Sequence, residues 1–414
     1  MKIFNPFYLI SPCIVFLSLS LILFFRQLEA EVNDDVASIV NGNTEFTLAL
    51  HSKLKRKNQN LFFSPLSISS ALAMTYAGAR QNTAIQMAKT LYFTVDKVKI
   101  HTAFMKLRSR LTSIGNQKNI NLTIANSIWP QKKYPILKTF SDLLTEYYGV
   151  SITPLDYEKN TESARLQINS WVEEHTNNRI KNILKPGLLN ILTRLVLVNA
   201  IYFKGNWTFQ FKKELTHDQP FYTVSGKSIK VPTMVQTNRF RYGEFNTLKV
   251  LELPYSGNEL SMIILLPTDK NGMEKLETDL SIENIIQWTS HTNKQKVRVF
   301  LPTFRITSQS DLSQSLKSIG MIDAFNQDKA DFSGIDNKKN NLYISAVIHK
   351  AFVEVNEEGS EAAAATAVVT RSLALVEPPP IFKADHPFLF FIRDNSTKCI
   401  LFWGRMNNPR DENQ

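Results

Sequence analysis

Residues 356–380 read NEEGSEAAAATAVVTRSLALVEPPP. The small side chains between Ser360 and Ala367 would let a backbone enter between packed neighbours with little steric resistance, and Val368 and Val369 favour a strand. By propensity alone, the four successive alanines favour a helix or disorder instead. The sequence on either side of this stretch decides between these interpretations.

Strand-like patterns flank the stretch on both sides. Residues 342–345 and 352–355 precede it, and residues 384–393 and 399–405 follow it as two strongly apolar segments around a polar turn. About twenty-five residues without a core pattern therefore lie between strands. Connections of this length in a compact domain are usually functional or disordered. We predict an exposed functional loop that can itself become a strand.

The rest of the chain combines helical and strand patterns. Two sets of residues fall at helical spacing, namely Phe104, Leu107 and Leu111, and Ile168, Trp171 and His175. Residues 250–253 and 260–266 follow strand patterns instead. With 414 residues, of which 43% are hydrophobic, the chain can bury a large core. We predict an α+β fold and a single large domain over residues 31–414.

Several ordered motifs give the chain a resemblance to the serpin family over nearly its whole length after residue 40. The segments that carry it are Phe62–Leu72, Asn169–Val172, Ile180–Lys181, Leu197–Trp207, Leu251–Tyr255, Leu301–Phe304, Gly320–Met321 and Asp331–Ser333. The resemblance implies the serpin fold, with three β-sheets, about nine helices and an exposed reactive-centre loop at about residues 357–381. It also implies that the largest sheet opens to receive this loop.

The resemblance implies a suicide-type inhibitor of serine proteases and not an enzyme. In serpins the target protease attacks the loop and forms an acyl-enzyme, and the loop then inserts into the central sheet and traps the protease covalently. The histidines and cysteines show no metal-ligand spacing, and the sequence has neither a G-x-S-x-G motif nor a glycine-rich phosphate loop. We expect no metal and no cofactor. A non-inhibitory serpin that acts as a carrier, chaperone or storage protein is the alternative.

The hinge of the loop can insert without burying a charge. Successive side chains of a strand face opposite sides, so Ser360 and Ala362 turn inward if Glu361 stays on the outer face. Non-inhibitory serpins tend to carry bulky or charged residues here, and the inward positions of this chain are small or apolar. The predicted hinge consists of Glu357, Glu358, Gly359, Ser360, Glu361, Ala362, Ala363, Ala364, Ala365 and Thr366.

The family's usual spacing from Gly359 places the reactive bond between Leu373 and Ala374. Leu373 would fill the hydrophobic primary pocket of a chymotrypsin-like protease. The bond between Arg371 and Ser372 is the rival, and it would suit a trypsin-like protease instead.

Two groups of residues match serpin positions that control insertion of the loop. Ser64, Ser67, Asn199 and His349 match the shutter, a polar cluster under the central sheet that would hold its strands until the loop arrives. Trp207 and Glu357 match the breach at the top of that sheet. Ordinary core packing or a satisfied buried hydrogen bond is the alternative for each residue.

Residues 1–30 form a separate segment. Residues 7–25 carry no charge and lead through Ala30 into an acidic stretch, which predicts a cleaved signal peptide and secretion to the extracellular space. An uncleaved membrane anchor is the alternative, because the apolar length approaches the ~20 residues that span a bilayer. Cleavage would remove Cys13 and leave Cys399 without an internal disulfide partner.

The net charge of +11 and a pI near 9.4 suggest attraction to polyanions. Lys99, Lys106 and Arg110 would share one face of a helix, and some serpins bind glycosaminoglycans through the corresponding helix. A solvated basic face is the alternative. No aromatic residues interleave with the basic ones in a recognised motif, so we expect no nucleic-acid binding. Apart from the covalent protease complex, we expect a monomer.

Overall fold

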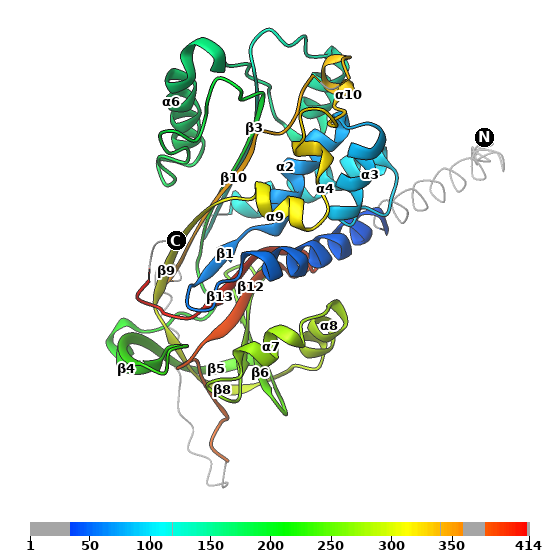
Figure 1. The fold of residues 1–414 in the computed structure, drawn as a ribbon. Coiled ribbons are helices and arrows are strands. Elements are labelled where there is room, and N and C mark those ends of the chain that lie inside the picture. The colour runs from blue at the N-terminus through cyan, green and yellow to red at the C-terminus, as the bar shows by residue number, and fades with distance from the viewer. Residues whose placement is uncertain (1–33, 118, 340, 359–376, 412–414) are drawn as a thin grey trace, which may run out of the picture.

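The computed structural model describes residues 34–117, 119–339, 341–358 and 377–411, which fold into two β-sheets covered by helices (Figure 1). The α-helices are one over residues 34–54 and α2 (Pro65–Gly78), α3 (Gln81–Thr90), α4 (Lys97–Gly115), α5 (Lys138–Leu143), α6 (Tyr157–His175), α7 (Met273–Thr278), α8 (Ile282–Ser290), α9 (Ser313–Ser318) and α10 (Ser333–Asp336). Shorter helical turns are η1 (Leu144–Tyr148), η2 (Lys213–Leu215) and η3 (Asp323–Phe325).

Thirteen strands are present in the described residues. They are β1 (Leu61–Phe63), β2 (Ile120–Pro130), β3 (Leu195–Gly205), β4 (His217–Tyr222), β5 (Ser228–Phe245), β6 (Leu248–Pro254), β7 (Leu260–Pro267), β8 (Asn293–Pro302), β9 (Phe304–Asp311), β10 (Ala346–Val355), β11 (Ile381–Lys383), β12 (Phe388–Asp394) and β13 (Ile400–Met406).

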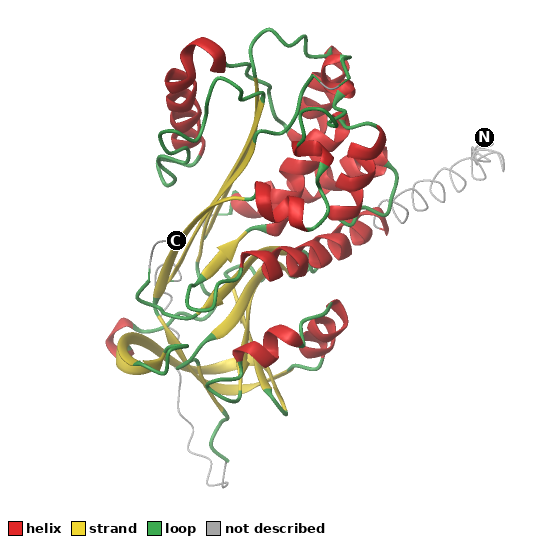
Figure 2. Ribbon diagram, viewed as in Figure 1, coloured by secondary structure: helices red, strands yellow, loops and turns green. Residues whose placement is uncertain are grey.

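The smaller sheet has four strands in the order β2-β3-β10-β9, with helices on both faces (Figure 2). Its central strands β3 and β10 are parallel, and the outer pairs are antiparallel. Val196 and Val198 pack in one cluster with residues of α6, whereas Leu195 and Leu197 face the main core that α2 and α4 share. Because both faces are covered, the first nine residues of β3 are buried and read as a nearly continuous apolar run.

The larger sheet has nine strands, in the order β1-β13-β12-β7-β6-β5-β8-β11 with β4 paired to β5. The described residues thus form two hydrogen-bonded sheets, whereas the sequence predicted three. The reason is the 18-residue strand β5, which pairs with β4 over residues 228–233, with β8 over residues 233–242 and with β6 over residues 241–245. The shared strand joins by hydrogen bonds what would otherwise be two sheets.

Most of the predicted elements are present, and one boundary was wrong. The predicted helical residues lie in α4 and α6, the strand patterns at 250–253 and 260–266 lie in β6 and β7, and β12 and β13 pair antiparallel around their polar turn. Residues 342–345 are not a strand. Their backbone bonds elsewhere, since the Ile344 N–H bonds the Ala324 carbonyl and the Ser345 N–H bonds the Leu195 carbonyl, and β10 begins only at Ala346.

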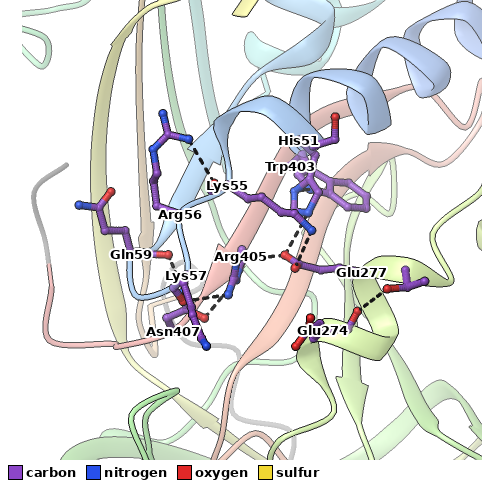
Figure 3. A network of polar contacts seen from close by, with 12 residues as sticks. His51, Lys55, Arg56, Lys57, Gln59, Glu274, Glu277, Trp403, Arg405 and Asn407 are labelled. Carbon is purple, nitrogen blue, oxygen red and sulfur yellow. Dashed lines mark hydrogen bonds and ion pairs between the residues drawn. The ribbon is translucent and has the colours of Figure 1, made fainter.

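A buried ion cluster fixes helix 34–54 and α7 to the larger sheet (Figure 3). The carboxylate of Glu277, whose side chain is 5% exposed, accepts from His51 Nε2 at 3.1 Å, Lys55 Nζ at 3.0 Å and Arg405 at 3.1 Å. Trp403 Nε1 donates to His51 Nδ1, so the imidazole is neutral and carries its proton on Nε2. Burial lowers the pKa of His51, in agreement with the neutral ring.

Replacing Glu277 by Gln should lower the free energy of unfolding by about 3 kcal/mol, because it leaves buried Arg405 without its counter-charge. Chemical denaturation at pH 7.5 measures this difference. The matched control is Glu274→Gln on the exposed side of the same helix, which should change stability by less than about 0.5 kcal/mol. Equal stability of the two variants would contradict a stabilising role of the cluster.

No helix among the described residues is long and apolar enough to span a bilayer. The predicted signal peptide, residues 1–30, lies outside the described residues. Cys399 is buried as a free thiol, and burial raises its pKa.

Candidate functional site

The centre of the four-stranded sheet holds the arrangement on which loop insertion depends. β3 and β10 pair directly, from Ala346 opposite Val196 to Val353 opposite Phe203, with no strand between them. β10 ends at Val355, two residues before the first residue of the predicted hinge, Glu357, and the chain returns at β11 in the other sheet. A loop that entered between β3 and β10 would have to replace these pairings.

A polar layer crosses three neighbouring strands at one level of the sheet. Asn126 of β2 and His349 of β10 both stand opposite Asn199 of β3. His349 Nδ1 donates to Asn199 Oδ1, and Asn199 Nδ2 donates to Asn126 Oδ1. The layer therefore ties β2, β3 and β10 together through side chains in addition to the backbone ladder.

Two serines at the amino terminus of α2, Ser64 and Ser67, also belong to this polar layer. The Ser64 N–H donates to His349 Nε2 at 3.1 Å, and Ser64 Oγ donates to the Leu401 carbonyl at 2.6 Å. Ser64 also caps α2 by accepting from the Ser67 N–H. Ser67 Oγ in turn accepts from Asn199 Nδ2. The four predicted shutter residues are thus brought into one hydrogen-bonded network.

The network requires a neutral imidazole at His349. Nε2 accepts from a backbone N–H, so the ring proton is on Nδ1, where it donates to Asn199. Desolvation lowers the pKa of His349 to about 3. At neutral pH every polar atom of this ring has a partner, and protonation would turn Nε2 into a donor that faces another donor.

Sequence reasoning missed Asn126, although a signal for it exists. In β2 the residues Ile120, Leu122, Ile124 and Ile128 face the main core at a period of two, and Asn126 interrupts the series. Asn199 and His349 interrupt the corresponding series in β3 and β10. The coincidence of the three interruptions at one level becomes visible only once the strand register is known.

The hinge leaves the sheet beside Trp207 and two lysines. Trp207 Nε1 donates to the Asn356 carbonyl at 3.0 Å, and its ring stacks on Tyr255 with centroids 4.5 Å apart. The Glu358 carboxylate lies 2.8 Å from Lys213 Nζ and 3.7 Å from Lys204 Nζ. The hydrogen bond from Lys213, with help from Lys204, lowers the pKa of Glu358.

The contacts at the breach are made by Asn356 and Glu358. Glu357, which the resemblance placed at the breach together with Trp207, is partly buried, and the ion pairs belong to the neighbouring Glu358. The contact of Trp207 runs to the backbone of Asn356. A backbone contact of this kind leaves no residue-type signal in the sequence.

Comparison with known proteins decides the family. The family model for serpins, described as serine protease inhibitors, matches residues 41–409. This chain belongs to the serpin family. It is 43% identical over 380 residues to human leukocyte elastase inhibitor, covering 89% of this chain and 99% of that protein. It is 41% identical over 393 residues to human serpin B3, covering 90% and 100%.

Solved serpin structures share the fold. Uncleaved ovalbumin superimposes with a TM-score of 0.83 at 33% identity, covering 90% of this chain and 100% of that one. Native protease nexin-1 with heparin gives a TM-score of 0.82 at 33% identity, with the same coverage. The predicted α+β serpin fold is confirmed.

Several predicted site residues of this serpin lie outside the described residues. They are the hinge from Gly359 to Thr366 and the reactive-bond residues Arg371, Ser372, Leu373 and Ala374. Among the described residues, no group of three or more His, Cys, Asp or Glu side chains could hold a metal ion.

The predicted polyanion face of this serpin lies on α4, where carboxylates hold two of its three cations. Lys99 Nζ lies 3.6 Å from Asp35, and Arg110 lies 2.7 Å from Glu259 and also pairs with Asp394. Lys106 is exposed. The described contacts therefore give Lys99 and Arg110 structural partners within the protein.

Proposed function

We propose that this serpin is a suicide-type inhibitor of serine proteases with chymotrypsin-like specificity. The observation that carries the proposal is the pair of parallel central strands, joined by a polar layer, with the hinge attached to the end of one of them. Human and horse leukocyte elastase inhibitors, which are 43% and 44% identical to this chain, carry the inhibitory function in their names.

The reaction begins on the loop. The protease serine Oγ attacks the carbonyl carbon of Leu373, the peptide bond to Ala374 breaks, and the leaving amine takes the proton that the protease histidine received from the serine. The product is an ester between Leu373 and the protease, with Ala374 as a new amino terminus. The remaining peptide from Gly359 to Leu373 is then no longer joined to the rest of the inhibitor at its far end, and it carries the protease there.

The direction of the new strand follows from the fold. The loop leaves the carboxyl end of β10 and must turn back to enter the sheet, so it runs antiparallel to β10. Because β3 is parallel to β10, the new strand is antiparallel to β3 as well. One parallel ladder is thereby exchanged for two antiparallel ladders, which are slightly more stable per residue. This gain in pairing favours insertion after cleavage.

The ester traps the protease only if insertion outpaces its hydrolysis. The polar layer around His349 and the contacts of Asn356 and Glu358 hold the sheet closed and the hinge outside. Cleavage removes the covalent restraint at the far end of the loop. The proposed function therefore combines a closed sheet before cleavage with rapid insertion afterwards.

The decisive experiment mixes the purified chain and its Leu373→Arg variant with chymotrypsin and with trypsin, followed by denaturing gels and peptide mass. The parent should form a denaturant-stable complex with chymotrypsin and release a peptide that begins at Ala374. The variant should form its complex about 100-fold faster with trypsin than with chymotrypsin, because an arginine suits the acidic primary pocket of trypsin.

Two results would contradict this proposal in different ways. A released peptide beginning at Ser372 would assign the reactive bond to Arg371. Complete cleavage without a stable complex, across a broad panel of proteases, would mean that the loop is only a substrate, and the non-inhibitory function would take precedence.

We also propose that the inhibitor is secreted after removal of residues 1–30. The support is the uncharged stretch of residues 7–25 and the position of Ala30. Amino-terminal sequencing of the protein from its native source distinguishes a mature chain that begins near Glu31 from an uncleaved anchor.

A further inference from the structure

Two neighbouring strands of the larger sheet carry five exposed cations. β8 presents Lys294, Lys296 and Arg298 at alternate positions, and β5 presents Arg239 and Arg241. We call these five residues the β5–β8 cationic face. The two strands lie at the end of the molecule remote from α2, α3 and α4 (Figure 1).

The strand register puts all five side chains on the same face. Arg241 stands opposite Lys294, Arg239 opposite Lys296, and Thr237 opposite Arg298. Residues directly opposite in an antiparallel pair point to one side of the sheet. The alternate residues point to the other side, where Phe240, Tyr242, Val297 and Val299 are buried. The cations therefore form two short parallel rows, with neighbours in a row ~6.6 Å apart.

The protein itself hardly neutralises this face. Among the described residues, the only acidic partner of the five cations is Glu252, which lies 3.7 Å from Arg241 and also binds Arg393 at 3.3 Å. Glu244 belongs to the opposite side of β5, where it accepts from the Tyr242 hydroxyl. This contrasts with α4, where Lys99 and Arg110 pair with carboxylates.

The arrangement is unfavourable for the isolated protein. Like charges directly opposite each other across a strand pair are destabilising, and Arg239–Lys296 and Arg241–Lys294 are two such pairs side by side. Glu252 and two hydrogen bonds to Thr292 compensate Arg241, whereas no carboxylate among the described residues pairs with Arg239 or Lys296. Departures of this kind from a local rule are expected at functional sites. The missing counter-charge would come from a ligand.

We propose that the β5–β8 cationic face binds a linear sulfated polysaccharide. Two rows of cations along the strands suit an extended chain of fixed anionic groups. The aromatic rings on these strands do not suit nucleic-acid bases, which need free rings for stacking. Phe240 and Tyr242 are buried on the far side, and the Arg298 guanidinium lies over the Phe300 ring at 5.1 Å.

The site adjoins the carboxyl end of the reactive-centre loop. Arg298 stands opposite Ile381 of β11, and its backbone N–H donates to the Pro380 carbonyl at 2.9 Å. A bound polysaccharide would thus lie beside the base of the loop. Binding itself requires no protease and does not depend on the proposed inhibitory function.

The test compares heparin binding of the full chain with that of two double variants that each remove two positive charges. The first variant, Arg239→Gln with Lys296→Gln, should bind heparin about 25-fold more weakly at fixed salt, since each Lys or Arg beside an anionic surface contributes roughly fivefold. Its plot of log affinity against log salt should lose about two units of slope. The control, Lys99→Gln with Lys106→Gln, should bind within about threefold of the parent.

Thermal unfolding without heparin shows whether the first variant is still folded. Its midpoint should equal or exceed that of the parent, because the substitution removes a like-charge pair. Three results would overturn the proposal: a parent that does not bind heparin at 0.15 M salt, an α4 variant that loses as much affinity as the β5–β8 variant, or a single-stranded DNA oligonucleotide that binds the parent as tightly as heparin does.

Discussion

Replacing Ser360 by Arg should abolish the covalent protease complex while leaving the loop fully cleavable. Ser360 is the first inward-facing residue of the hinge if Glu361 stays outside, so it must enter the sheet before any later residue can. At the carboxyl end of β10, where this entry would occur, Val353 and Val355 are buried in the main core. An arginine at position 360 would bring an unpaired charge into this apolar region.

The expected size of the effect follows from the cost of that charge. Burying an uncompensated guanidinium costs at least about 3 kcal/mol, which would slow insertion about 100-fold. Hydrolysis of the acyl-enzyme is unaffected by the substitution, so nearly all of the inhibitor would be turned over as substrate. The measurement is the ratio of complex to cleaved chain on denaturing gels after reaction with chymotrypsin.

A matched control separates insertion from recognition. Glu361→Arg keeps a charged side chain on the outer face and should still form the complex. Cleavage of both variants at the same bond and rate would show that docking of the protease is intact. A Ser360→Arg variant that forms as much complex as the parent would contradict insertion as the trapping step.

The parts of the fold that follow from local periodicity could be predicted from the sequence. The spacing of Phe104, Leu107 and Leu111 predicted α4, and the apolar runs before and after Asp394 predicted the pair β12 and β13. Each of these patterns reflects burial of one face of a single element. The start of β10 could not be predicted in this way, because Leu342 and Ile344 are buried without belonging to a strand.

Contacts between distant segments could be predicted only through the family resemblance or not at all. The resemblance brought together Ser64, Ser67, Asn199 and His349, whereas Asn126 lay outside the motifs compared. The Glu277 cluster joins His51 to a residue 226 positions away, and nothing in either local sequence indicates the partner. The same holds for Arg110 of α4, whose carboxylate partner Asp394 lies 284 positions along the chain. The number of basic residues on one face of α4 therefore overestimated how many of them are available to bind a ligand.

Replacing His349 by Gln should destabilise the protein and should also make its free energy of unfolding less dependent on pH in acid. At pH 7.5 the substitution leaves the buried Ser64 N–H and the side-chain oxygen Oδ1 of Asn199 with poorer partners, which should lower the free energy of unfolding by about 2–4 kcal/mol. The loss should appear as a lower midpoint of urea unfolding. Because the same side chains join β3 to β10, the variant should also insert its loop into the sheet without cleavage more readily on heating.

The acid response distinguishes a titrating histidine from a merely structural one. The folded-state pKa of His349, about 3, is below the value of about 6.5 for an unfolded histidine, so the unfolded chain binds one more proton between these two pH values. His349 therefore contributes fully to stability above pH 6.5, and its contribution falls by about 1.4 kcal/mol per pH unit as the pH decreases below that value. The Gln variant should lack this component, so its stability should fall less steeply between pH 6.5 and 4.5. The matched control is His291→Gln, which removes an imidazole at an exposed position outside the polar layer. Equal slopes for the parent and His349→Gln would mean that the folded protein accepts a proton at this site, which contradicts the neutral imidazole that the polar layer requires.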